Sequence, residues 1–143
     1  GVEGYKRISE EIVEQTDNNS RLWVVIPAGI GDGVFGVWKG FLELKKIGRI
    51  RKLPRLVAVQ GEGCAPLVQA FRRGWKEPRK LSKVKGIALS IREPYSGRHA
   101  LQAVRDSKGT AVGVSDRERH AGRAARRRDP AHYSSSRQRK PIR

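Results

Sequence analysis

Three glycines at alternate positions, Gly29, Gly31 and Gly33, lie between two apolar segments. Residues 22–26 before them are apolar throughout, which is typical of a parallel strand covered on both faces. Residues 34–47 after them carry apolar side chains at helical spacing. A glycine loop that leads from a strand into a helix presents unpaired N–H groups and the positive end of the helix dipole. The pattern predicts an anion site, most often for phosphate.

Three kinds of phosphate loop compete for this segment. A nucleoside triphosphate loop needs Lys and then Ser or Thr at the helix start, whereas Val34 and Phe35 follow Gly33. Residues 31–36 match the dinucleotide pattern G-x-G-x-x-G, but the acidic residue expected at the end of the next strand is displaced to Glu62. The third kind holds a single cofactor phosphate through backbone groups alone. A purely structural turn is the remaining interpretation.

The rest of the chain alternates between predicted helices and strands. We expect helices over residues 3–15, 34–47, 65–73 and 96–107, and strands over residues 22–26, 56–60 and 110–114. This alternation predicts βαβ units, and therefore an α/β fold in which helices cover both faces of a three-layer parallel sheet. Ligands of such sheets bind beyond the carboxyl ends of the strands, and residues 28–33 lie there.

Histidine and cysteine offer few candidates for chemistry. His99, His120 and His132 have no metal-ligand spacing with one another or with Cys64, so we expect no metal site. No histidine is close in sequence to Cys64, which favours a small packed residue over a reactive thiol. A single cysteine cannot form a disulfide within the chain, and this favours a reducing cytoplasm.

The charge of the chain is strongly basic, at +17 over 143 residues. Residues 117–143 contain ten Arg or Lys against Glu118 and Asp129, a net charge of +8, with little apolar content. We expect this tail to have low order. It is either an arm that binds nucleic acid non-specifically through phosphates or an out-of-frame extension without function. No apolar run approaches 18 residues, so no membrane span is expected.

Five segments resemble threonine synthases in order and spacing: residues 3–6, 25–33, 37–41, 54–66 and 111–116. The resemblance implies a pyridoxal-phosphate enzyme of the tryptophan synthase β type, with the large domain of fold type II. It also implies conversion of O-phosphohomoserine and water to threonine and phosphate, by an enzyme that forms a homodimer at full length. A threonine or serine dehydratase shares the fold and the glycine loop, and is the related alternative. A small basic nucleic-acid-binding module is the alternative from a different class.

The same resemblance assigns the cofactor phosphate to the backbone N–H groups of Gly29, Ile30, Gly31, Asp32 and Gly33. The carboxylate of Asp32 is the unusual member of this set. At a few ångströms it would repel a phosphate by about 1–4 kcal/mol. We therefore expect it to point away from the anion and to cap the following helix.

The remaining catalytic groups are expected outside the chain. In the family, the Schiff-base lysine and the asparagine at the ring hydroxyl lie upstream of residue 3, and the partner of the ring nitrogen lies downstream of residue 116. Lys6 and Lys39 do not occupy the Schiff-base position. Residues 1–116 are thus predicted to be a segment from the C-terminal half of the large domain, inactive alone, with residues 117–143 as a separate tail. Glu62 faces either the cofactor edge or solvent.

Overall fold

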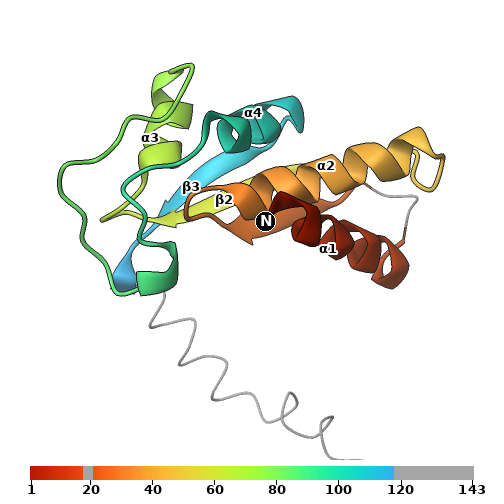
Figure 1. Ribbon diagram of the computed structural model, residues 1–143, viewed down its shortest axis with the longest axis horizontal. Coiled ribbons are helices and arrows are strands. Elements are labelled where there is room, and N and C mark those ends of the chain that lie inside the picture. Colours follow the sequence, from red (N-terminus) through yellow and green to blue (C-terminus); the bar gives the residue numbers. More distant parts are fainter. Residues whose placement is uncertain (18–20, 118–143) are drawn as a thin grey trace, which may run out of the picture.

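The computed structural model describes residues 1–17 and 21–117, which form an α/β fold (Figure 1). Its elements are α1 (Val2–Gln15), β1 (Trp23–Pro27), α2 (Asp32–Lys46), β2 (Arg55–Gly61), α3 (Pro66–Arg73), the 3₁₀ helix η1 (Leu89–Ile91), α4 (Arg98–Asp106) and β3 (Thr110–Val114). Every predicted helix and strand is present, with bounds that shift by at most two residues. The predicted tail beyond Arg117 lies outside the described residues, as do His120 and His132.

The three strands form one parallel sheet in the order β1-β2-β3. Val25 pairs with Val57 and Ile26 pairs with Ala58, while Ala58 also pairs with Ala111 on the other side. Because the strands run in one direction, their carboxyl ends lie at the same edge of the sheet. The predicted α/β class with a parallel sheet is confirmed.

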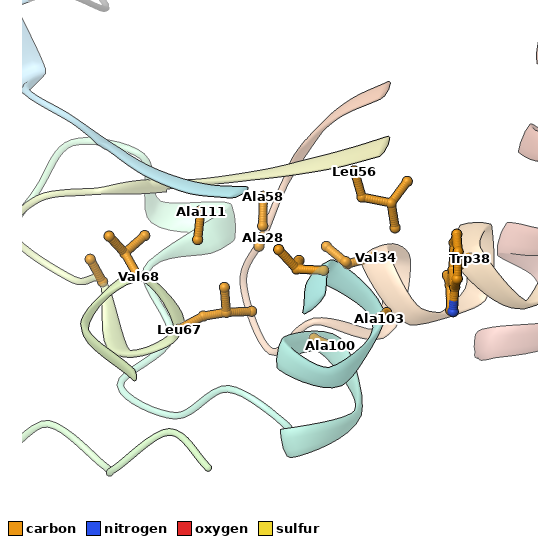
Figure 2. Packing of buried hydrophobic residues seen from close by; sticks show 12 residues of the cluster. Ala28, Val34, Trp38, Leu56, Ala58, Leu67, Val68, Ala100, Ala103 and Ala111 are labelled. Carbon is orange, nitrogen blue, oxygen red and sulfur yellow. The ribbon is translucent and has the colours of Figure 1, made fainter. Parts of the chain in front are cut away.

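One face of the sheet is covered by α2, α3 and α4. Leu56, Ala58 and Ala111 project from the strands toward these helices and are at most 4% exposed (Figure 2). They share a cluster with Val34 of α2 and Leu67 of α3, both of which are fully buried. The two strand alanines are small, so the helices can approach the sheet closely. This face holds the main hydrophobic core.

The opposite face of the sheet is bare within the described residues. Trp23 and Val25 of β1 are 54% and 64% exposed, and the Arg55 guanidinium lies 5.2 Å from the centroid of the Trp23 ring. Alternate side chains of a strand point to opposite sides, and the three connecting helices all pack on one side. Residues 22–26 are therefore covered on one face, not on both as expected. The predicted second helical layer is not seen in the described part of the chain.

The first helix, α1, lies alongside α2 (Figure 1). Two glycines of α2 allow this close approach. The Cβ of an alanine at Gly36 would lie 2.6 Å from the Cβ of Tyr5, and one at Gly40 would lie 2.9 Å from the carbonyl oxygen of Lys6. Ser9 is fully buried between the two helices. Across residues 1–17 and 21–117, no helix is both long and apolar enough to cross a membrane.

Candidate anion-binding site

The glycine loop, residues 28–33, connects the carboxyl end of β1 to the first turn of α2. Gly31 is the N-cap residue of α2 and has φ 106° and ψ 0°, a left-handed conformation that glycine adopts without strain. The N–H of Phe35 donates to the Gly31 carbonyl at 3.0 Å and is the first to enter the helical pattern. The N–H groups that precede it have no acceptor within the helix. Such N–H groups, together with the helix dipole, attract anions.

Two buried polar side chains hold the loop from behind. Gln60, at the end of β2, donates from Nε2 to the carbonyl oxygens of Ala28 at 3.2 Å and Gly29 at 3.4 Å. The hydroxyl of Ser96 donates to the same Gly29 oxygen at 2.9 Å and accepts from Gln60 at 3.1 Å. Both side chains are fully buried and uncharged. The loop is therefore held by hydrogen bonds from two side chains that are themselves buried.

A cavity of about 540 Å³ opens on the other side of the loop. Its walls are α1, β1, the glycine loop, the first turns of α2, and η1 with Glu93 just after it. The lining residues are Tyr5, Ile8, Ile12, Val24, Val25, Ile26, Pro27, Ala28, Gly29, Ile30, Gly31, Asp32, Gly33, Val37, Ser90, Ile91 and Glu93. Most of the lining residues are apolar. No lysine or arginine of the described residues is among them. Positive charge at this site comes from the backbone alone.

All five residues predicted to hold the phosphate line this cavity. They are Gly29, Ile30, Gly31, Asp32 and Gly33. The structure brings them together at the start of α2, and their contact with a phosphate stays a prediction.

The predicted role of Asp32 as a helix cap is wrong. The N-cap of α2 is Gly31, and no side chain makes a capping hydrogen bond there. Asp32 is the first helical residue instead, where its exposed carboxylate lies near the positive end of the helix dipole. The left-handed glycine starts the helix one position earlier than a capping aspartate would require.

Lys6 and Lys39 form ion pairs that join α1 to α2. Lys6 pairs with Glu3 at 2.7 Å and with Glu43 at 2.6 Å, and Lys39 pairs with Glu3 at 2.9 Å. The hydrogen bonds that Lys6 donates to its carboxylate partners, Glu3 first, raise the pKa of Lys6 above its ordinary value. An amine must lose its proton before it can attack a carbonyl. That neither lysine serves as the Schiff base stays a prediction.

The other candidate side chains have structural roles. The Cys64 thiol is buried and donates to the Glu93 carbonyl at 3.1 Å, and its burial raises its pKa. The prediction of a packed cysteine is confirmed. His99 packs against Phe35, with ring centroids 5.2 Å apart. No group of three or more His, Cys, Asp or Glu in residues 1–17 and 21–117 could hold a metal. Glu62 is exposed and does not line the cavity.

Gln60 and Ser96 are the residues of this site that the sequence analysis did not identify. Gln60 is only the last residue of the predicted strand 56–60, and Ser96 is the start of a predicted helix that in the structure begins at Arg98. The available signal was a polar residue at the end of an apolar strand. Buried polar groups are nearly always hydrogen-bonded, so such a residue indicates a specific partner.

A parallel sheet with a glycine loop between a strand and a helix N-terminus defines a class of α/β proteins that bind anionic ligands at this edge. Within that class, residues 1–127 match the sequence profile of the pyridoxal-phosphate dependent enzymes, and the chain belongs to this family.

The relatives by sequence include threonine synthases. The chain is 34% identical over 119 residues to those of Methanosarcina acetivorans and Methanocaldococcus jannaschii, and each match covers 82% of this chain and 29% of the relative. Threonine synthase 2, chloroplastic, of Arabidopsis thaliana is 30% identical over 120 residues, 82% of this chain and 23% of that protein. The chain thus spans less than a third of the length of these relatives.

Solved structures share the fold. Threonine deaminase isoform 2 of Solanum lycopersicum matches with a TM-score of 0.62 at 23% identity, over 80% of this chain and 30% of that one. Maize serine racemase matches with the same TM-score and identity, over 81% of this chain and 33% of that one. These similarities concern the arrangement of the elements and confirm the predicted fold class.

Proposed function

We propose that the glycine loop holds the phosphate of pyridoxal phosphate in an enzyme of the threonine synthase type. The observation that supports this most directly is the position of Gly31, whose left-handed conformation turns the chain from β1 into the N-terminus of α2. Such a loop holds a phosphate through N–H groups and the helix dipole without a charged side chain. The 34% identity to threonine synthases supports O-phosphohomoserine as the substrate, with threonine and phosphate as products.

The cofactor, when bound, supplies an electron sink for carbanion chemistry. The residues of this chain bind and orient it. The loop N–H groups fix the phosphate, and the apolar side chains of β1 and α1 line the cavity beside it. No lysine of the described residues lines the cavity, so these residues orient the cofactor and do not hold it covalently.

A dehydratase remains the related alternative, since threonine deaminase shares the fold. That similarity lies at 23% identity, whereas the identity to threonine synthases reaches 34%. The synthase assignment therefore takes precedence.

The phosphate assignment is tested by ligand titration of the chain, followed through tryptophan fluorescence. Pyridoxal phosphate should bind at least about 10-fold more tightly than pyridoxal, because only the former carries the charged group that the loop N–H groups recognise. Inorganic phosphate should compete with it. Equal affinity for pyridoxal and pyridoxal phosphate would contradict the proposal.

A matched pair of variants distinguishes the effect of a carboxylate in the loop from the effect of the same change farther along α2. Ile30→Asp places a carboxylate beside the anion at a position that is 47% exposed, and Leu42→Asp makes the same change at a 43% exposed position of the helix. Only Ile30→Asp should weaken phosphate binding. In the presence of cofactor and O-phosphohomoserine, the unaltered chain should release no phosphate above a control with cofactor alone.

A further inference from the structure

Three successive carbonyl groups of the glycine loop are hydrogen-bonded from the same side. The Ala28 oxygen accepts from Gln60, and the Gly29 oxygen accepts from both Gln60 and Ser96. The Ile30 oxygen accepts from the N–H of Gly97 at 2.7 Å. These donors belong to β2 and to the segment before α4, and none of Gln60, Ser96 and Gly97 lines the cavity.

The planarity of the peptide bond converts these contacts into a direction for the N–H groups. In a trans peptide the C=O of one residue and the N–H of the next point in opposite directions, and the described residues contain no cis peptide. With the carbonyls of residues 28–30 bonded from behind, the N–H groups of Gly29, Ile30 and Gly31 point to the other side. That side is the cavity.

The Gln60 amide cannot reverse without losing hydrogen bonds at both ends. Its Oε1 accepts from the N–H groups of Leu67 at 2.9 Å and Val68 at 3.2 Å, in the first turn of α3. Its Nε2 donates to the loop and to the Ser96 hydroxyl. An amide has one donor end and one acceptor end, so the N-terminus of α3 and the glycine loop fix its orientation together.

We propose that Gln60 and Ser96 are positioning residues that aim the N–H groups of Gly29 and Ile30 at a bound phosphate, while the N–H of Gly97 holds the third peptide group of the loop. The identity of the anion rests on the function proposed above. Neither side chain touches the anion, and both act through the carbonyls of residues 28 and 29. Since both are neutral, they hold the loop without adding a charge that would alter its attraction for an anion.

Two variants test this proposal, and a third serves as the matched control. Gln60→Glu keeps an acceptor for α3 but, as a carboxylate, gives the loop no donor. Ser96→Ala removes the second donor to the Gly29 oxygen. Ser107→Ala is the control, because Ser107 is also buried and hydrogen-bonded, to Leu56 and Val104, at the opposite end of the sheet.

The measurement is a titration of the ¹⁵N-labelled chain with inorganic phosphate, followed by the amide signals of residues 29–31. Loss of a buried hydrogen bond should weaken phosphate binding by about 10-fold or more in Gln60→Glu and by roughly 5-fold in Ser96→Ala. Both should also shift the loop amide signals before any phosphate is added. Ser107→Ala should lower the stability of the fold and leave phosphate affinity within about 2-fold of the unaltered chain.

The outcomes separate this inference from the function on which it rests. If the unaltered chain binds no phosphate, the proposed function fails, and the positions of the loop amide signals in the free variants still test the positioning role. Unchanged loop signals in both Gln60→Glu and Ser96→Ala would overturn the proposal. So would equal losses of phosphate affinity in Ser96→Ala and Ser107→Ala.

Discussion

Helix α2 is attached to the rest of the molecule in two different ways. At its N-terminus, the glycine loop is held by the neutral side chains of Gln60 and Ser96, which are fully buried. Along its length, α2 contacts α1. Ion pairs between exposed groups, such as that of Lys39 with Glu3 at 2.9 Å, lie at the edge of this contact. The first attachment consists of buried hydrogen bonds, whereas the second combines close packing at Gly36 and Gly40 with long side chains in solvent.

The difference shows where a precise site can form. A buried hydrogen bond between neutral groups depends strongly on the positions of its partners, because a displaced partner leaves a buried polar group without a hydrogen bond. It depends little on salt or pH. An exposed ion pair is screened by salt and contributes little to stability. The loop end of α2 is therefore fixed strongly enough to hold an anion in one orientation, and the α1 side serves to cover the cavity.

The largest effect should follow from substitution of Gly31. An alanine there would adopt a left-handed conformation and would place its Cβ against that of Ala100. Strain of about 1–2 kcal/mol and overpacking of about 1–3 kcal/mol should together lower the free energy of unfolding by about 2–5 kcal/mol. Urea denaturation measures this loss, and phosphate binding should be lost as well.

Gly48 provides the control for this experiment. It also has a positive φ, of 79°, at the other end of α2, but a Cβ there would meet nothing within 4 Å. Gly48→Ala should therefore show only the backbone strain. The double variant Gly31→Ala with Ala100→Gly should recover part of the steric loss. Equal losses for Gly31→Ala and Gly48→Ala would show that the loop does not pack against α4.

The sequence predicted the loop because its signals are local. Three glycines between an apolar run and a helical pattern lie within a dozen residues, and the parallel strands followed from the alternation of elements. Gln60 and Ser96 could not be found in this way, since they lie 31 and 67 residues from Gly29 in the chain. A hydrogen bond between distant residues leaves no periodic signal.

Two errors in the sequence analysis have physical causes. Asp32 has the residue type of a helix cap, but a left-handed glycine before it already starts the helix. Residues 22–26 are apolar at every position, which indicates two apolar faces but does not say what covers them. In the described residues, the helices cover the face that carries Leu56, and the face that carries Val25 stays exposed.

A smaller effect is expected where α1 meets α2. In Gly40→Ala, the new Cβ would overlap the Ser9 hydroxyl and lie 2.9 Å from the Lys6 carbonyl oxygen. Backbone atoms cannot rotate away as side chains do, so α1 must shift, at a cost of about 1–3 kcal/mol. The higher helix propensity of alanine offsets about 1 kcal/mol of this. Urea denaturation should therefore show a net loss of about 0–2 kcal/mol.

The location of that loss distinguishes the two attachments of α2. Gly40→Ala should leave the phosphate affinity of the loop nearly unchanged, because Gln60 and Ser96 are not disturbed. Limited proteolysis should cut α1 more readily in the variant. A gain in stability over the unaltered chain would show that α1 does not pack this closely against α2.

The smallest effect concerns the ion pairs of α1 and their dependence on pH. Hydrogen bonds from Lys6 and then Lys39 lower the pKa of Glu3 to about 2 from an ordinary value of 4.5. A lowered pKa stabilises the fold above pH 4.5, and this contribution is lost as the pH falls from 4.5 to about 2. The raised pKa of Lys6 acts in the opposite direction, since its contribution is complete below pH 10.5 and is lost as the pH rises further.

Glu3→Gln tests this pH dependence, and Ser96→Ala provides the comparison with the buried hydrogen bonds of the loop. The variant should be slightly less stable than the unaltered chain at pH 7, as judged from the urea midpoint, and the small difference reflects the exposure of these groups. It should vanish near pH 2 and also in about 1 M salt, where charges are screened within roughly 3 Å. The effect of Ser96→Ala should stay constant under the same changes, because neither Ser96 nor its partners titrate. A Glu3→Gln difference that persists in high salt would mean that α1 is held by packing and not by charge.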